Sequence, residues 1–250
     1  MSARDNILNK IRKAQTPNSN AAEVIAQHLA QHPRGPRPNI PDDLVAHFKA
    51  RALKLSSDVL ETDDSKNVPQ LLADYLREKS LPMSGVCWPE LADLPWLAAG
   101  LEIHAHPPLP HLNPDGTTSH STKPASGQVA GYLTKGEEAN ISLREFNDTD
   151  AVGVTSAFCA IAETGTLMML GSANTAATTS LLPETHVAIV DPKRIVATME
   201  DAWELMRKEF SQPPRAVNFI SGPSRTADIE QTVTLGAHGP YRVLLILAPL

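Results

Sequence analysis

Two segments in the last hundred residues concentrate side chains that can bind an anion. The first, Ala162–Thr166, places one carboxylate and two hydroxyls beside a glycine, between two apolar runs. The second, Ser221–Glu230, follows another apolar run and combines hydroxyls, backbone amides and a guanidinium group. Such donors bind phosphate and carboxylate. We therefore expect a small-anion site here, with the second segment as the more specific candidate.

Each segment also has an ordinary structural explanation. The first fits a hairpin corner in which Gly165 takes a positive φ and Glu163 is solvated. The second fits a Gly-Pro turn followed by a helix, with its hydroxyl or carboxylate side chains as helix caps. Capping leaves Arg225 beside the turn unexplained, and both explanations stay open at this point.

Two histidines stand beside strand-length apolar runs. His186 precedes the run 187–190, and His238 lies in a glycine-containing turn before the last run. Imidazole groups titrate near neutrality, although a lone histidine at a strand entrance more often makes only a backbone hydrogen bond. We take Glu163 and His238 as the candidate catalytic residues. The candidate ligand-binding residues are Thr164, Gly165, Thr166, His186, Ser221, Gly222, Ser224, Arg225, Thr226 and Asp228.

Metal and redox chemistry find little support. His104 and His106 would share one face of a strand, but a metal site needs further well-placed ligands, so we predict no metal site. Cys87 and Cys159 each stand alone in an apolar stretch. Neither CxxC chemistry nor a cysteine-ligated iron–sulfur cluster is therefore expected, and we predict no cofactor in this chain.

The composition argues against nucleic-acid and membrane functions. The 250 residues carry a formal net charge of −6, whereas binding to phosphate backbones needs a basic surface. The uncharged run 164–183 has transmembrane length, but its glycines, asparagine and hydroxyls suit hydrocarbon poorly. Residues 1–13 lack the compact apolar region of a signal peptide, and no GxGxxG, Walker or GxSxG motif occurs. We expect a cytoplasmic protein.

The chain divides into an N-terminal appendage and one α/β core. Residues 1–41 hold two helical patterns and a proline-rich linker at 32–38. In residues 42–250, helical periodicity alternates with strand-length apolar runs, which is typical of a partly parallel α/β sheet. The role of residues 107–140 stays open. The predicted helices are 7–14, 22–30, 44–55, 68–81 and 199–210, and the predicted strands are 85–88, 157–162, 167–170, 187–190, 217–220 and 243–247.

Four stretches in order along the chain carry a specific combined pattern. They are VGVTSAFCAIAETGT at 152–166, LLPETH at 181–186, SGPSRTADIEQ at 221–231 and LGAHGPY at 235–241. Together they resemble the lactate utilization protein C family, the LUD-domain proteins. The resemblance is dense from about residue 150 to residue 247 and looser in 7–14 and in WPELADLPW at 88–96.

This resemblance implies a Rossmann-like α/β sheet similar to the sugar-isomerase and CoA-transferase group, with an N-terminal helical appendage. It also implies a role in oxidising L-lactate to pyruvate alongside separate iron–sulfur partner proteins. The two isolated cysteines agree with that division of labour, because a cluster needs several cysteine ligands in one place.

Three functional hypotheses follow. The first is a component of a lactate-oxidising system that binds a small carboxylate or phosphate-bearing ligand. The second is an enzyme resembling acyl or CoA transferases, or nucleotide-dependent ligases, that uses Glu163; for transfer, a strand-end glutamate on a similar fold can act as the nucleophile. The third is a non-catalytic interaction subunit that docks through residues 1–41.

Overall fold

The protein is described by a computed structural model that covers residues 2–14, 20–31, 35, 39–107, 111–112, 118–119, 150–229, 232–236 and 238–250. The chain forms two units, Met1–Pro38 and Asn39–Leu250. In the first unit, α1 (Ala3–Ala14) and α2 (Ala21–Gln31) realise the two predicted helical patterns. Helix α1 begins with a reciprocal pair, because Asp5 donates its backbone amide to the Ser2 hydroxyl and accepts from the Ser2 amide.

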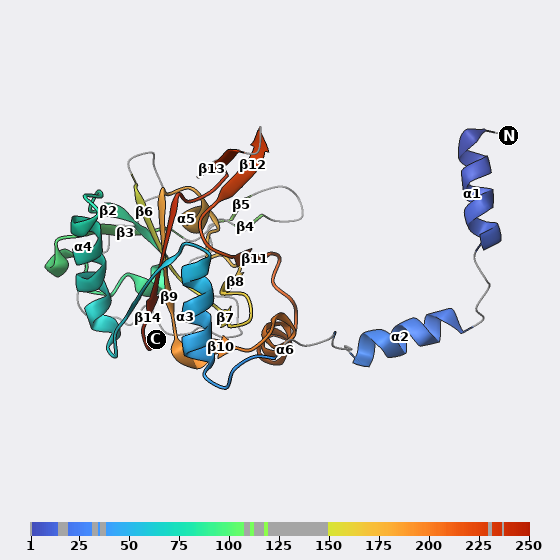
Figure 1. Cartoon of the computed structure of the whole chain (residues 1–250), viewed down its shortest axis with the longest axis horizontal. Coiled ribbons are helices and arrows are strands. Elements are labelled where there is room, and N and C mark those ends of the chain that lie inside the picture. The colour runs from blue at the N-terminus through green and yellow to red at the C-terminus, as the bar shows by residue number, and fades with distance from the viewer. Residues whose placement is uncertain are drawn as a thin grey trace. The chain divides into compact units, whose positions relative to one another are not determined.

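A parallel sheet of six strands forms the centre of the second unit, among the residues that the structure describes (Figure 1). Every neighbouring pair runs parallel, with Asp58 opposite Leu244 at one edge of the sheet. The predicted α/β class with a parallel sheet is therefore confirmed. In spatial order the strands are β1 (Asp58–Glu61), β14 (Arg242–Leu247), β9 (Thr185–Val190), β6 (Val152–Ser156), β2 (Ser84–Cys87) and β3 (Glu102–Ala105).

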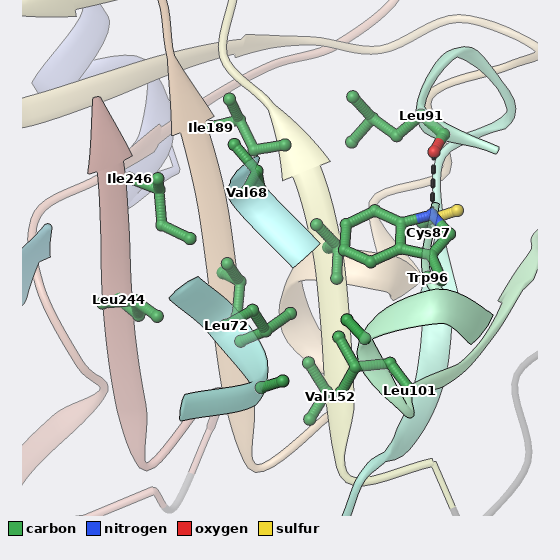
Figure 2. Packing of buried hydrophobic residues seen from close by; sticks show 14 of the residues in the cluster. Val68, Leu72, Cys87, Leu91, Trp96, Leu101, Val152, Ile189, Leu244 and Ile246 are labelled. Carbon is green, nitrogen blue, oxygen red and sulfur yellow. Dashed lines mark hydrogen bonds between the residues drawn. The ribbon is translucent and has the colours of Figure 1, made fainter. Parts of the chain in front are cut away.

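One face of this sheet is covered by α4 (Val68–Glu78), whose apolar positions repeat at helical spacing. Val68 and Leu72 of α4 pack against Ile189, Leu244 and neighbouring strand residues (Figure 2). Three short 3₁₀ turns flank this core, η1 (Ser65–Asn67), η2 (Pro89–Leu91) and η3 (Leu97–Ala99). They place a tryptophan in it, and the indole nitrogen of Trp96 donates to the Leu91 carbonyl at 2.9 Å. The strands of the central sheet are covered on both faces, and such strands consist of nearly continuous apolar runs.

The opposite face of the sheet packs on α3 (Leu44–Lys54) and on a second, smaller sheet. Phe48 and Ala52 of α3 are fully buried in this layer. The smaller sheet has the order β10 (Ile195–Val196), β7 (Cys159–Ile161), β8 (Thr166–Leu170) and β11 (Val217–Ile220), among the described strands. Helix α6 (Met199–Glu209), at the predicted helix 199–210, covers its outer side and begins with a Thr198–Asp201 capping box.

Short elements complete the second unit. They are α5 (Thr178–Leu181), η4 (Pro192–Arg194) and the strand pairs β12 (Arg225–Ile229) with β13 (Thr232–Leu235) and β4 (His111–Leu112) with β5 (Thr118–Ser119). The prediction of a helix after the Gly-Pro turn at residue 222 is wrong, because the chain forms strand β12 there. The physical reason is the β-branched content of residues 226–234, which favours pairing into a hairpin over a capped helix.

Candidate functional site

The first candidate segment forms the turn between β7 and β8. Gly165 has a φ of 67°, and its backbone amide donates to the Ile161 carbonyl at 2.9 Å. This is the hairpin corner with a positive-φ glycine. The turn lies directly on α3, because a Cβ atom at Gly165 would come within 2.7 Å of the Ala52 backbone nitrogen. Glycine is therefore needed here both for its backbone conformation and for the close approach of helix and turn.

The second candidate segment leaves β11 and passes over the end of the same helix. Gly222 has a φ of 78°, and a Cβ atom there would lie 2.5 Å from the Leu55 carbonyl oxygen. Because β11 pairs antiparallel with β8, Ile220 lies opposite Leu167, and the two candidate segments meet at one end of the smaller sheet. The smaller sheet thus brings together two stretches that the sequence separates by more than fifty residues.

A chain of hydroxyl groups joins the two segments. The Thr164 hydroxyl donates to Thr166 at 2.8 Å, and the Thr166 and Ser221 hydroxyls share a hydrogen bond of 2.7 Å. Thr166 is buried, whereas Thr164 and Ser221 are exposed. The side chains that could meet a ligand from solvent are therefore held in place by a buried hydroxyl between them.

Arg225 interacts with the C-terminal end of α3. Its guanidinium donates to the Leu55 carbonyl at 3.2 Å and to the Ser56 hydroxyl. Ser56 has a φ of 66°, and the Ser57 amide reaches back to the Ala52 carbonyl at 3.1 Å, so the helix closes in the manner of a left-handed C-terminal cap. A cation is favourable beside these carbonyl groups. Helix capping within its own segment left Arg225 unexplained. Its contact with the end of α3 now gives it a structural role.

Ser224 connects this turn to the loop before β14. Its amide donates to the Pro240 carbonyl at 2.9 Å, and its carbonyl accepts from the Gly236 amide at 3.0 Å. The Ser224 hydroxyl accepts from the His238 amide at 3.3 Å. His238 is exposed beside it. We name the side chains gathered at this end of α3 the α3-end cluster: Thr164, Thr166, Ser221, Ser224, Arg225 and His238.

The remaining candidates lie elsewhere or have undescribed side chains. Glu163 is half-buried beside the cluster, and its amide donates to the Ala197 carbonyl at 3.0 Å. Its carboxylate makes no hydrogen bond or ion pair within the described part of the chain. His186 lies inside the central sheet, fully buried, where burial lowers its pKa to about 4. Thr226 and Asp228 belong to β12, and their side chains lie outside the described residues.

The sheet order reveals one polar contact that sequence reasoning missed. The chain leaves β2 toward β3 but leaves β6 toward β9, so the connections diverge at the carboxyl ends of β2 and β6. Ligands of open α/β sheets bind at such points. There the Ser156 hydroxyl donates to the Glu90 carboxylate. Both residues fall within stretches that carry the family resemblance, but their proximity depends on a strand order that local patterns do not encode.

A cavity of about 300 Å³ lies at the same edge of the sheet, beyond the ends of β1, β14 and β9. Glu61, Thr62 and Asp63 line it, together with Val45, Pro192 and Leu247. Lys49 of α3 pairs with Glu61 at 2.6 Å, so the Glu61 charge is already matched. None of the sequence candidates lines this cavity.

The described ranges hold no group of three or more His, Cys, Asp or Glu side chains that could bind a metal ion. No helix in them is long and apolar enough to cross a membrane. Cys87 and Cys159 are buried in different apolar clusters, where burial raises the pKa of each thiol to about 12.

Comparison with known proteins finds a family model and several relatives that point to the same family. The family model described as the LUD domain matches residues 45–248. A lactate utilization protein C from Bacillus subtilis is 33% identical over 213 residues, covering 82% of this chain and 78% of that protein. Another from Bacillus licheniformis is 29% identical over 252 residues, covering 98% and 95%.

Two further matches come from a more local relative and from a solved structure. An uncharacterized protein of Neisseria meningitidis is 43% identical over 103 residues, covering 41% of this chain and 43% of that protein. A crystal structure of a DUF162 family protein from Deinococcus radiodurans superposes with a TM-score of 0.52 at 18% identity, covering 84% of this chain and 99% of that one, which shows a shared fold. With its central sheet, its smaller sheet and the α3-end cluster all inside the matched residues, this chain belongs to the LUD domain family.

Proposed function

We propose that this protein is a cytoplasmic component of an L-lactate utilization system and supports oxidation of L-lactate to pyruvate together with separate iron–sulfur proteins. The relatives named lactate utilization protein C support this role. The cysteines support the separation of tasks. Cys87 and Cys159 lie in different apolar clusters, and an iron–sulfur cluster is held by several thiolates around one centre. Electrons would therefore travel through the partner proteins.

Within that system, the α3-end cluster binds a small carboxylate or phosphate group. The observation that carries this proposal is the position of Arg225, an exposed residue whose guanidinium lies at the Leu55 carbonyl, which the Gly222 turn also approaches. Its present acceptors are the Leu55 carbonyl and the Ser56 hydroxyl, both neutral. An anion is a stronger acceptor for a guanidinium than a neutral oxygen, so a ligand carboxylate or phosphate can share or replace these contacts.

The architecture supports a Rossmann-like sheet similar to the sugar-isomerase and CoA-transferase group as the setting for this site. The six described strands run parallel, and the order of their connections reverses once. Connecting loops carry many of the binding sites of such proteins. The α3-end cluster lies on loops that precede β1 and β14, and its parts are anchored by α3 and by the smaller sheet.

A binding experiment on the purified chain tests the site. Isothermal titration with L-lactate, pyruvate and inorganic phosphate should detect at least one ligand. Arg225→Gln should weaken its affinity by about tenfold or more, the usual effect of losing one charge-assisted contact. Arg215→Gln, at an exposed arginine away from the cluster, should leave the affinity unchanged. Equal affinities in the two variants would rule out the α3-end cluster as the site.

The proposed division of labour has its own test. The purified chain alone should fail to oxidise L-lactate in the presence of artificial electron acceptors, because no redox centre is assigned to it. Turnover should appear only when the iron–sulfur partner proteins are added. Robust turnover by the isolated chain would contradict the proposal even if Arg225 proved to bind the anion.

Acyl transfer through Glu163 is a second candidate, favoured by one observation. The Glu163 carboxylate is half-buried beside the cluster and makes no ion pair or hydrogen bond with the described residues, so it remains available as a nucleophile. Attack on an acyl-CoA thioester would form a glutamyl anhydride and release CoA as the thiol. Incubation with acetyl-CoA followed by hydroxylamine should then convert Glu163 to a hydroxamate. The adduct should be absent in Glu163→Gln, and its absence from the wild-type chain would eliminate this candidate.

A further inference from the structure

A group of polar side chains lies fully buried between the central sheet and α5. His186 of β9, Thr155 of β6 and Thr179 of α5 each have none of their surface exposed. Burying polar groups is unfavourable unless they are hydrogen-bonded. The partners of each polar atom in this group therefore decide whether the site is complete.

The imidazole of His186 points to the side of the sheet on which α5 packs. Gly153 of β6 lies opposite His186 in the parallel register, and Thr155 lies two residues further along β6, so its side chain leaves the same face. The His186 Nε2 atom and the Thr155 hydroxyl are 2.8 Å apart. This contact fixes the orientation of the ring on the α5 side of the sheet.

Helix α5 touches the sheet immediately beside this ring. A Cβ atom at Gly153 would lie 1.8 Å from the Thr179 carbonyl oxygen and 2.7 Å from Cγ of Pro183. The absence of a side chain at Gly153 is thus what allows the backbone of α5 to rest on β6. Because Gly153 and His186 are opposite each other in the two strands, the Thr179 backbone rests on the strand next to the one that carries the imidazole.

Two polar atoms at this junction have no protein partner. The His186 Nδ1 atom and the Thr179 hydroxyl oxygen are both buried and make no hydrogen bond to the described residues. Leaving such an atom unsatisfied costs about 1–3 kcal/mol each. Native interiors seldom leave such buried atoms without a hydrogen-bond partner, and ordered water often supplies it.

We infer that the junction of β9, β6 and α5 is a binding site for one water molecule, held between His186 Nδ1 and the Thr179 hydroxyl. Water both donates and accepts, so it satisfies the ring nitrogen and the hydroxyl in either tautomer of the imidazole. An ion is excluded by the burial of the site, because no opposite charge accompanies it there among the described side chains.

This assignment gives His186 a ligand different from the anion that the sequence favoured. His186 is not a member of the α3-end cluster, so the inference does not depend on the proposed function. The water would act as a bridge between β9 and α5. It would hold the connection that carries the chain from the smaller sheet back to the central one.

A crystal structure of the full chain at a resolution better than about 2 Å tests the inference. We expect a water within the usual hydrogen-bond distance of about 2.7–3.2 Å from both Nδ1 of His186 and the Thr179 hydroxyl. Direct contact between these two atoms, a dry junction or a different occupant would overturn it.

Two variants extend the test to solution. Thr179→Val preserves the shape of the side chain but removes the hydroxyl, so it should lose the water and lower the melting temperature by roughly 2–6 °C. Thr179→Ser retains the hydroxyl and should keep the water with a smaller loss. Nuclear Overhauser contacts between a long-lived water and the His186 ring should be present in the wild-type and Ser chains and absent in the Val chain. Contacts that persist unchanged in the Val chain would refute the bridging role of Thr179.

Discussion

The hydroxyl of Thr166 shares a 2.7 Å hydrogen bond with the hydroxyl of Ser221, and this contact ties the β7–β8 turn to the segment that leaves β11. Thr166 is buried at the centre of the contact, whereas Ser221 is reached by solvent. The bond therefore combines a structural anchor with a side chain that is free to meet a ligand on its outer side.

Removing this bond should affect stability in a non-additive way. Ser221→Ala and Thr166→Val should each destabilise the fold, and their double-mutant cycle should show a coupling energy of about 0.5–1.5 kcal/mol. Urea denaturation monitored by fluorescence measures these values. Ser211→Ala, at an exposed serine after α6, is the matched control and should be additive with Thr166→Val. Additive behaviour of the Ser221 pair would mean that the contact is not formed in solution.

Substitution of the two positive-φ glycines against α3 should be severe. Gly165→Ala and Gly222→Ala each combine a left-handed backbone with a Cβ atom that meets helix backbone at 2.7 and 2.5 Å. Each should lower the free energy of unfolding by at least about 2 kcal/mol. Gly239→Ala, whose Cβ would lie 3.4 Å from the Ser224 side chain, is the control and should be nearly neutral. Similar midpoints for all three variants in urea would contradict the close packing of the turns on α3.

The buried His186 should make the protein sensitive to mild acid. Burial lowers its pKa in the folded state to about 4, against the ordinary imidazole pKa of about 6.5. The unfolded chain therefore binds a proton first as the pH falls, so the stability that neutral His186 contributes is complete above about pH 6.5 and is lost progressively toward pH 4. The expected loss is roughly 3 kcal/mol over that range.

Comparison with a variant isolates this contribution from other titrating groups. His186→Gln cannot be protonated, so its stability should fall less steeply between pH 7.5 and pH 5 than that of the wild-type chain, even if it is less stable at pH 7.5. Urea titrations at several pH values give both curves. Parallel curves would show that His186 is not the group responsible.

The two thiols should be inert in the native protein. Cys87 and Cys159 are buried, and burial raises the pKa of each to about 12, so almost no thiolate is present at pH 8. Iodoacetamide should label neither residue in hours, and both should react within minutes in denaturing urea. Mass spectrometry of tryptic peptides resolves the two sites. Rapid native labelling of either would show an accessible thiol and would weaken the argument that redox centres lie in other proteins.

The sequence predicted the secondary structure best where periodicity and burial agree. The apolar faces of α3, α4 and α6 and the continuous runs of β9 and β14 are visible as local patterns, and the structure confirms them. Strand β1 was missed because its four residues, Asp58 to Glu61, alternate little and become a strand only by pairing with β14. The division of the strands between two sheets depends on non-local pairing, which no local pattern contains.

The two segments of the candidate site could be identified from the sequence, but the helix end that they contact could not. The two segments were identified by their hydroxyl, carboxylate and guanidinium groups, and the positive φ of Gly165 was expected for a hairpin corner. Their common contact, the end of α3, was not, because the helix lies more than a hundred residues earlier in the chain. The partner of Arg225 was missed for the same reason, since Leu55 and Ser56 give no local sign that they accept from a distant guanidinium.

The position of β14 between β1 and β9 has a consequence for how the chain folds. Leu244 pairs beside Asp58, a residue made much earlier during synthesis, so among the described strands β1 has no neighbour in the sheet until β14 has left the ribosome. Such distant pairing slows folding, because the entropy of closing a long loop is lost before the contacts form. A nascent chain halted before residue 242 would expose the edges of β1 and β9. We therefore expect molecular chaperones to bind this protein mainly before β14 has been synthesised.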